Sequence, residues 1–201
     1  MTVTFSFWQL AMFAGLIVLA AAIPLWLLSR LAGAVPPAVS VPGKKGGVGG
    51  LLLVTVGILV VEALASLWHF GRGLGEVIRI MLMDTSFIWP VLQTLIPDFA
   101  AAVFLMTAVC ALVFGRSPRA LGLAVVCAWL GGPLTAVLRH IYLGIPLDIT
   151  GEPTAFCLLT VVISFYLLFS VRSALTYGTA SARRMQKDWH ETAMKNAGHA
   201  R

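Results

Sequence analysis

Five long stretches of hydrophobic residues follow one another along the chain, separated by short segments that hold most of the charged residues. Each stretch is long enough to cross the roughly 30 Å hydrocarbon core of a bilayer as a helix, which takes about 20 residues. The strands of a membrane barrel would instead alternate hydrophobic and polar residues over short segments. The predicted spans are residues 5–28, 51–70, 99–115, 120–142 and 154–171. The sequence therefore predicts an all-α integral membrane helical bundle of five transmembrane helices.

Composition and charge support the same class of protein. Of the 201 residues, 59% are hydrophobic and 11% are charged, and the mean hydropathy is +0.94. A soluble domain of this composition would expose extensive hydrophobic surface, so a soluble enzyme or binding domain is excluded. The net charge of +6 does not indicate nucleic-acid binding, because we expect the basic residues to lie beside anionic lipids at the inner leaflet.

The distribution of lysine and arginine predicts the orientation of the bundle. If the N-terminus is outside, 11 of the 14 basic residues fall on the cytoplasmic side, and such an excess is typical of inner loops. These residues are Arg30, Lys44, Lys45, Arg116, Arg119, Arg172, Arg183, Arg184, Lys187, Lys195 and Arg201. We therefore expect a multi-pass protein of the bacterial cell inner membrane, oriented N-out and C-in.

The spans divide the chain into three parts. Residues 1–46 hold an additional first transmembrane helix and a cytoplasmic linker, residues 47–178 hold a four-helix membrane domain, and residues 179–201 form a basic cytoplasmic tail. One helix start has a clear local signal, because Ser117 is a typical N-cap and Pro118 suits the first helical position.

A long outer connector, residues 71–98, lies between the second and third spans. Its hydrophobic residues at helical spacing are Leu74, Val77, Ile78 and Met81. This pattern predicts an outer interfacial helix, amphipathic and lying along the membrane surface. The third span is expected to begin only after Pro97, since proline lacks the backbone N–H that a helix interior needs.

Glu62 is a carboxylate in the middle of the second predicted span. A charge at that depth costs roughly 2.5 to 3.5 kcal/mol on insertion scales and is normally kept only where it faces protein or water. Thr55, Glu62, Ser66 and His69 are separated by seven, four and three residues, so they share one stripe of the helix surface. We expect this stripe to face other helices.

Polar groups of the fourth and fifth spans are predicted to lie at the depth of Glu62. Gly131, Gly132 and Pro133 should interrupt the fourth helix, whereas Thr160 and Ser164 share a face of the fifth. At 1.5 Å per residue these groups lie about 15 to 20 Å from a helix end, near the midplane. One interpretation is a proton or cation site built from the carboxylate and freed carbonyls. The other is that Glu62 and the hydroxyls hold the helices together by hydrogen bonds.

His69 and His140 are predicted at the same outer edge, because the second and fourth spans both run outward. Two facing histidines can ligate a haem, and the alternative is a pair of ordinary interfacial histidines. The cysteines are not spaced for a metal, so no metal site is predicted. No cofactor is predicted either, although haem b stays open as the cofactor of the histidine alternative.

Two short motifs resemble a known family. Residues 47–52, Gly-Val-Gly-Gly-Leu-Leu, open a span, three further spans follow, and residues 165–172, Phe-Tyr-Leu-Leu-Phe-Ser-Val-Arg, precede Thr176 and Tyr177. This arrangement resembles the YdgK-type family of bacterial inner-membrane proteins, a four-helix family of unknown function, over about residues 47–178. The chain departs from the family pattern at Leu51, where tryptophan is usual, at Phe165, where proline is usual, and in its additional first helix. The resemblance implies a bundle and a location, and it supplies no catalytic residue.

These observations favour a non-enzymatic accessory or assembly subunit of a bacterial inner-membrane complex. Its expected partners are the lipid bilayer, anionic lipids at the inner leaflet and other membrane protein subunits. The alternative is a small carrier or proton-coupled translocation subunit that uses Glu62, and the third hypothesis is a haem or quinone redox membrane subunit. Five spans are few for a self-sufficient carrier, which is why the first hypothesis leads.

Overall fold

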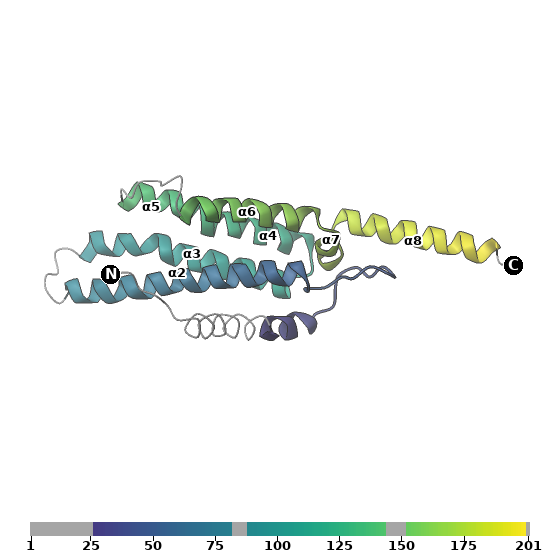
Figure 1. Cartoon of the computed structure of the whole chain (residues 1–201), viewed down its shortest axis with the longest axis horizontal. Helices are drawn as coiled ribbons and strands as arrows, with labels where there is room; N and C mark the ends of the chain where they lie inside the picture. Colours follow the sequence, from purple (N-terminus) through teal and green to yellow (C-terminus); the bar gives the residue numbers. More distant parts are fainter. Residues whose placement is uncertain (1–25, 82–87, 144–151, 200–201) are drawn as a thin grey trace, which may run out of the picture.

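The computed structural model describes residues 26–81, 88–143 and 152–199, and every regular element within these ranges is a helix (Figure 1). Residues 26–33 are helical and precede a loop that leads to α2. The other helices are α2 (Leu51–Met81), α3 (Ile88–Phe114), α4 (Pro118–Trp129), η2 (Leu130–Leu134), α5 (Thr135–Leu143), α6 (Glu152–Phe169), α7 (Val171–Tyr177) and α8 (Ala180–His199).

α3 is the central helix of the bundle. It packs along α2, and it also packs against α4, η2 and α5, whereas α6 packs against η2, α4 and α7 (Figure 1). The side chains between these helices form one continuous hydrophobic core. Its members include Leu52, Val56, Leu59, Leu105, Ala108, Leu112, Leu121, Ala124, Ile163 and Leu167.

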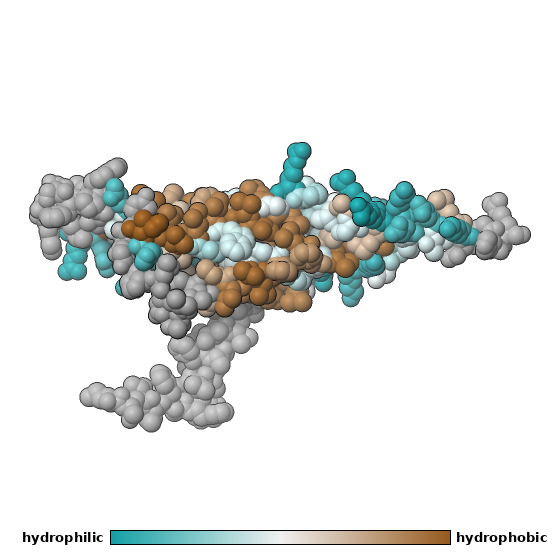
Figure 2. Space-filling view, turned by 90° about the horizontal axis from the view of Figure 1, so that it is seen from above, coloured by the Kyte–Doolittle hydropathy of each residue, from teal (hydrophilic) through white to brown (hydrophobic). Residues whose placement is uncertain are grey.

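Three helical stretches are long and apolar enough to cross a membrane: Leu51–Arg79, Gln93–Phe114 and Pro118–Ile141. α6 and α7 give a fourth span if the bent pair is counted as one, and the bend between them is 66°. Figure 2 shows hydrophobic surface over the middle of the bundle and hydrophilic surface along α8. The protein is therefore an all-helical membrane protein with three or four described spans, and most of the first predicted span, residues 5–28, lies outside the described residues.

The outer connector differs from the prediction. Its first part is helical, as expected, but it continues α2 without a break to Met81, and α3 already begins at Ile88. A separate interfacial helix was the wrong prediction, because glycines in a helix cost only about 1 kcal/mol each and remove no hydrogen bond. Gly73 lets α3 approach α2 closely, because a Cβ at this position would lie only 2.5 Å from Cδ2 of Leu95 on α3. Val77 is buried, so this part of α2 packs within the bundle.

The third helix also begins earlier than predicted. Pro97 lies inside α3 with its side chain fully buried. Such a proline is tolerated in a membrane helix because neighbouring helices and local adjustments satisfy the freed backbone group. The predicted start of α4 is confirmed, since the Ser117 side chain accepts a hydrogen bond from the backbone N–H of Ala120 at 3.2 Å and Pro118 is the first helical residue.

The fourth span is not broken at its glycines, which corrects the predicted interruption at Gly131, Gly132 and Pro133. Residues Leu130–Leu134 form one turn of π-helix, η2, and the stretch from α4 through α5 is long enough to be a single span. A π-turn places one extra residue in the hydrogen-bond ladder, which accommodates the missing N–H of Pro133. The feature is a local widening of the helix.

The end of the bundle that holds the predicted cytoplasmic loops, called the inner end here, is a junction between α7 and the loop before α2. The backbone N–H of Val39 donates to the Leu175 carbonyl at 3.0 Å, and that of Gly47 donates to Oγ1 of Thr176 at 3.0 Å. α7 is almost wholly buried there, from Ser173 onward. The two motifs of the family resemblance, far apart in the sequence, therefore lie in contact.

Arg116 fixes the start of this loop to the turn between α3 and α4. Its guanidinium donates to the carbonyls of Ala32, Val35 and Pro36 at 3.2, 3.1 and 3.2 Å, and to those of Leu112 and Gly115 at 3.3 and 2.6 Å. Burial lowers the pKa of this guanidinium from its ordinary value, but arginine stays charged in proteins. The segment predicted as a linker thus belongs to the packed inner end.

The first testable prediction concerns topology, which still rests on the distribution of basic residues. Reporter fusions after Lys45, after Arg119 and at the C-terminus should read cytoplasmic, and a fusion near Asp84 should read periplasmic. Activity of a reporter that works only in the cytoplasm, compared with one that works only in the periplasm, measures this. A periplasmic C-terminus would contradict the N-out and C-in orientation.

Candidate functional site

The glycine pair of η2 lies where three helices meet. A Cβ on Gly131 would lie 2.8 Å from Cγ of Leu105 on α3, and a Cβ on Gly132 would overlap the ring of Phe156 on α6. Both glycines are buried. Their first role is therefore steric, because they let α3 and α6 approach the same turn from two sides.

The hydroxyl groups predicted for the site belong to α6, which packs against η2 and α4. Thr160 is buried and donates to the Phe156 carbonyl at 2.9 Å, and Ser164 donates to the Thr160 carbonyl at 2.7 Å. The indole N–H of Trp129 on α4 donates to Oγ of Ser164 at 3.0 Å. This bond links α4 to α6 at membrane depth, where a polar contact between helices is worth about 0.6 kcal/mol on average.

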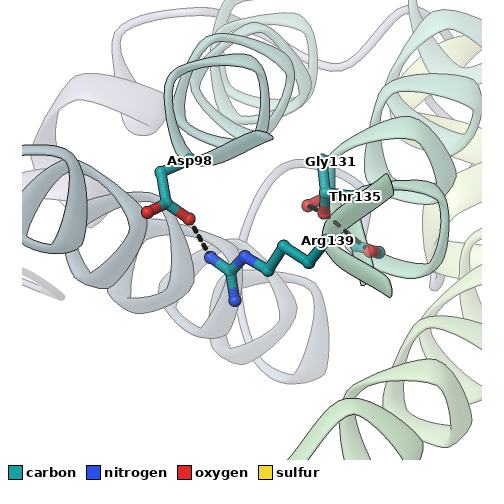
Figure 3. A network of polar contacts seen from close by, with 5 residues as sticks. Asp98, Gly131, Thr135 and Arg139 are labelled. Atoms are coloured by element: carbon teal, nitrogen blue, oxygen red, sulfur yellow. Dashed lines mark hydrogen bonds and ion pairs between the residues drawn. The ribbon is translucent and has the colours of Figure 1, made fainter. Parts of the chain in front are cut away.

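The carbonyls that the sequence predicted to be freed at the break already accept hydrogen bonds. Oγ1 of Thr135, which is buried, donates to the carbonyls of Gly131 and Gly132, at 2.7 and 2.8 Å (Figure 3). The threonine lies one turn beyond the glycines, so its hydroxyl supplies a donor where the π-turn disturbs the ladder. These oxygens thus stabilise the turn.

An ion pair that sequence reasoning missed lies one turn farther out. Arg139 on α5 donates to the carboxylate of Asp98 on α3, and the two side chains are 40% and 19% exposed (Figure 3). The sequence placed Asp98 outside the third span, because that span was expected to start after Pro97. Asp98 lies inside α3 and Arg139 lies in α5, and their opposite charges were the signal that could have paired them.

The stripe predicted on the second span follows one edge of the buried face of α2. Thr55 is buried and donates to the Leu51 carbonyl at 2.9 Å, whereas Glu62 and Ser66 are half-buried and His69 is exposed. The stripe therefore leaves the protein interior as it runs outward. Glu62 lies near the middle of the span, where an ionised carboxylate costs the most free energy.

The structure brings together five of the seven residues predicted for the intramembrane site. η2, which holds Gly131, Gly132 and Pro133, packs against α6, which carries Thr160 and Ser164, and the direct contact is made by Gly132. Glu62 and Ser66 lie on α2, which packs chiefly against α3. The sequence predicted a common level for these groups, whereas their neighbours depended on the order of the helices around α3.

The two candidate haem ligands lie on α2 and α5, and both are exposed. α3 packs against both of these helices, and the pair Asp98 and Arg139 joins α3 to α5 near His140. Among the described residues no group of three or more His, Cys, Asp or Glu side chains could hold a metal ion. Cys127 is buried in the core, Cys157 is half-buried and Cys110 is exposed.

The fold and the polar contacts define a multi-pass helical membrane protein in which the Asp98–Arg139 ion pair joins α3 to α5 and the Trp129–Ser164 hydrogen bond joins α4 to α6. Comparisons with protein-family models, with curated proteins and with solved structures found no match to this chain.

Proposed function

We propose that this protein is a non-enzymatic accessory or assembly subunit of a bacterial inner-membrane complex. The observation that carries this proposal is the way polar side chains are used between α3, α4, η2 and α6. The hydroxyls and the Trp129 indole bond to one another or to the backbone, and no buried side-chain N or O atom of the described residues lacks a hydrogen-bond partner. Polar groups that are all hydrogen-bonded within the bundle make it rigid, and rigidity suits a subunit that supports other proteins.

A second feature that supports an accessory role is α8. This helix of 20 residues continues away from the bundle along its long axis (Figure 1). Its base is fixed, because Ala182 is buried in a cluster with Val39 and Val41, and Nζ of Lys44 donates to Sδ of Met185 at 3.2 Å. Beyond that base Trp189 is 40% exposed, and an isolated helix of this length is only marginally stable in water. A partner that covers Trp189 would stabilise it.

Purification from native membranes in a mild detergent tests this proposal. We expect one or a few membrane proteins to copurify in fixed ratio with the wild-type protein, identified by mass spectrometry. Trp189→Ala should reduce the copurified amount several-fold, because it removes the aromatic side chain most suited to an interface. Met194→Ala is the matched control, since Met194 is also exposed but lies on another side of α8. Recovery of the protein alone would contradict the accessory role.

The absorption spectrum of the same sample tests the redox hypothesis. An accessory subunit should show no Soret band, because two exposed histidines would hold a haem where water reaches it. A haem spectrum that disappears in both His69→Ala and His140→Ala would replace the proposal with a redox subunit.

Glu62 decides between the accessory proposal and its main alternative, a carrier or proton-coupled translocation subunit. This alternative is favoured by the half-buried position of Glu62 near the middle of the span. If the residue is structural, Glu62→Gln should preserve stability and function, since the amide keeps the shape and can still form hydrogen bonds. Glu62→Leu should cost about 0.6 kcal/mol for each hydrogen bond that the carboxyl group makes to a neighbouring helix.

Thermal unfolding and complex assembly of both Glu62 variants provide the measurement. Thr55→Val is the control, because the Thr55 hydroxyl bonds only within its own helix. A Glu62→Gln variant that folds normally but abolishes function would overturn the accessory role, because an amide cannot release a proton.

A further inference from the structure

The inner end of the bundle holds a cationic side chain that the described protein atoms satisfy only in part. Nε of Arg172 donates to the Gly47 carbonyl at 3.1 Å, but its two terminal nitrogens have no acceptor among the described residues. The ion pairs found in the described ranges do not involve this arginine either. It differs in this from Arg116, which is surrounded by carbonyls. The two terminal nitrogens of a guanidinium are suited to an oxyanion, which they bind through two parallel hydrogen bonds.

The Arg172 guanidinium lies against the backbone at the start of α2. A Cβ on Gly49 would lie 2.7 Å from Nη2, and a Cβ on Gly50 would lie 2.8 Å from Nη1. A side chain at either glycine would push the guanidinium away from this position, and Gly50 also has a positive φ of 55°, which favours glycine. Lys45 is exposed two residues before Gly47 and adds a second positive charge, and the N–H groups of the first turn of α2 raise the local potential further.

Hydrophobic side chains exposed to the bilayer flank this cation. Leu51 begins α2 and is 66% exposed, Phe169 ends α6 and is 76% exposed, and Val171 is 50% exposed. Side chains of this kind mark the edge of the hydrocarbon, so Arg172 lies at the level of lipid headgroups. A free phosphate ion would gain nothing from these three side chains, whereas a phospholipid presents a phosphate and acyl chains together.

We propose that Arg172, together with Lys45, binds the phosphate of an anionic phospholipid at this end of the bundle, with its acyl chains against Leu51, Phe169 and Val171. The bound lipid completes the hydrogen bonding of the guanidinium and thereby stabilises the junction between α7 and the loop before α2. This site does not depend on the accessory role, because it needs no protein partner.

Delipidated full-length protein, titrated with defined lipids in detergent, tests the site. Phosphatidylglycerol should raise the midpoint of thermal unfolding more than phosphatidylcholine at the same mole ratio, and native mass spectrometry should detect the bound lipid. Inorganic phosphate forms a third arm, and it should give no comparable increase. An equal increase with phosphate would overturn the lipid site in favour of a free anion, and equal increases with the two lipids would overturn the requirement for anionic charge.

Arg172→Gln should weaken phosphatidylglycerol binding about tenfold, equivalent to removing one charge-assisted hydrogen bond. Lys45→Gln, at an exposed position, should weaken it by a smaller factor without disturbing the fold, so it tests the site even if Arg172→Gln unfolds. Lys187→Gln is the matched control, because it removes the same unit of charge from exposed α8. Unchanged binding in both site variants, or an equal loss in Lys187→Gln, would contradict the proposal.

Discussion

Replacing Gly132 with alanine should destabilise the protein strongly. A Cβ at this position would overlap the ring of Phe156 and lie 3.2 Å from Oγ1 of Thr160, and Gly132 is buried. Overpacking of this kind usually costs about 1 to 3 kcal/mol, and the ring can move only by disturbing the contact between η2 and α6. We expect a clear fall in the midpoint of thermal unfolding in detergent.

Gly122 supplies the control on the same span. It lies in α4, it is exposed, and a Cβ there would meet nothing within 4 Å. Gly122→Ala should therefore leave stability unchanged or raise it by up to about 1 kcal/mol through helix propensity. Adding Phe156→Leu to Gly132→Ala should recover part of the loss, because the smaller side chain makes room. A Gly132→Ala variant as stable as Gly122→Ala would refute the close packing of η2 on α6.

Removing the carboxylate of Asp98 should produce the second large effect. Asp98→Ala leaves Arg139 without its ion-pair partner at the outer end of α5. Breaking a fully buried pair typically costs about 3 to 5 kcal/mol. Because the Arg139 side chain is 40% exposed, water screens part of that cost, and we expect a loss of about 1 to 3 kcal/mol. Thermal unfolding in detergent measures it.

Exchanging the two charges distinguishes destabilisation by loss of the ion pair from destabilisation by loss of packing. Asp98→Arg combined with Arg139→Asp restores opposite charges, so the double variant should be more stable than either single variant. Arg79→Ala is the control, since Arg79 is exposed near the outer end of α2 and should matter little. If the double variant is no better than the worse single variant, the two side chains do not form a stabilising pair.

The two predictions concern neighbouring parts of the fourth span, because Gly132 lies in the π-turn and Arg139 lies in α5, which follows that turn. This helix follows the π-turn and is joined to α3 through Asp98 and to its own preceding turn through Thr135. The Thr135 hydroxyl stabilises the widened turn from within, and the ion pair fixes the segment beyond it. Removing either interaction should therefore loosen the same outer segment while leaving the inner junction intact.

The sequence by itself determined the class of protein and much of the helix pattern. Long apolar runs have to form helices in a bilayer, because no water is present to satisfy an exposed backbone. The start of α4 was also predicted correctly, since Ser117 and Pro118 act through their own backbone neighbours. The polarity of single residues likewise indicated their depth, which is why the residues of η2 and α6 were expected at one level.

Only the tertiary structure decided which of these groups meet. Whether Pro97 ends or continues a helix depends on the neighbours that pack around it, so the length of α3 could not be read from its own sequence. The same holds for Asp98 and Arg139, whose pairing requires α5 to lie beside α3. It holds for Arg172, which meets Gly47 only because α7 folds back on the loop before α2. Local patterns are set by interactions within a few residues, whereas these contacts depend on how separate helices are ordered in space.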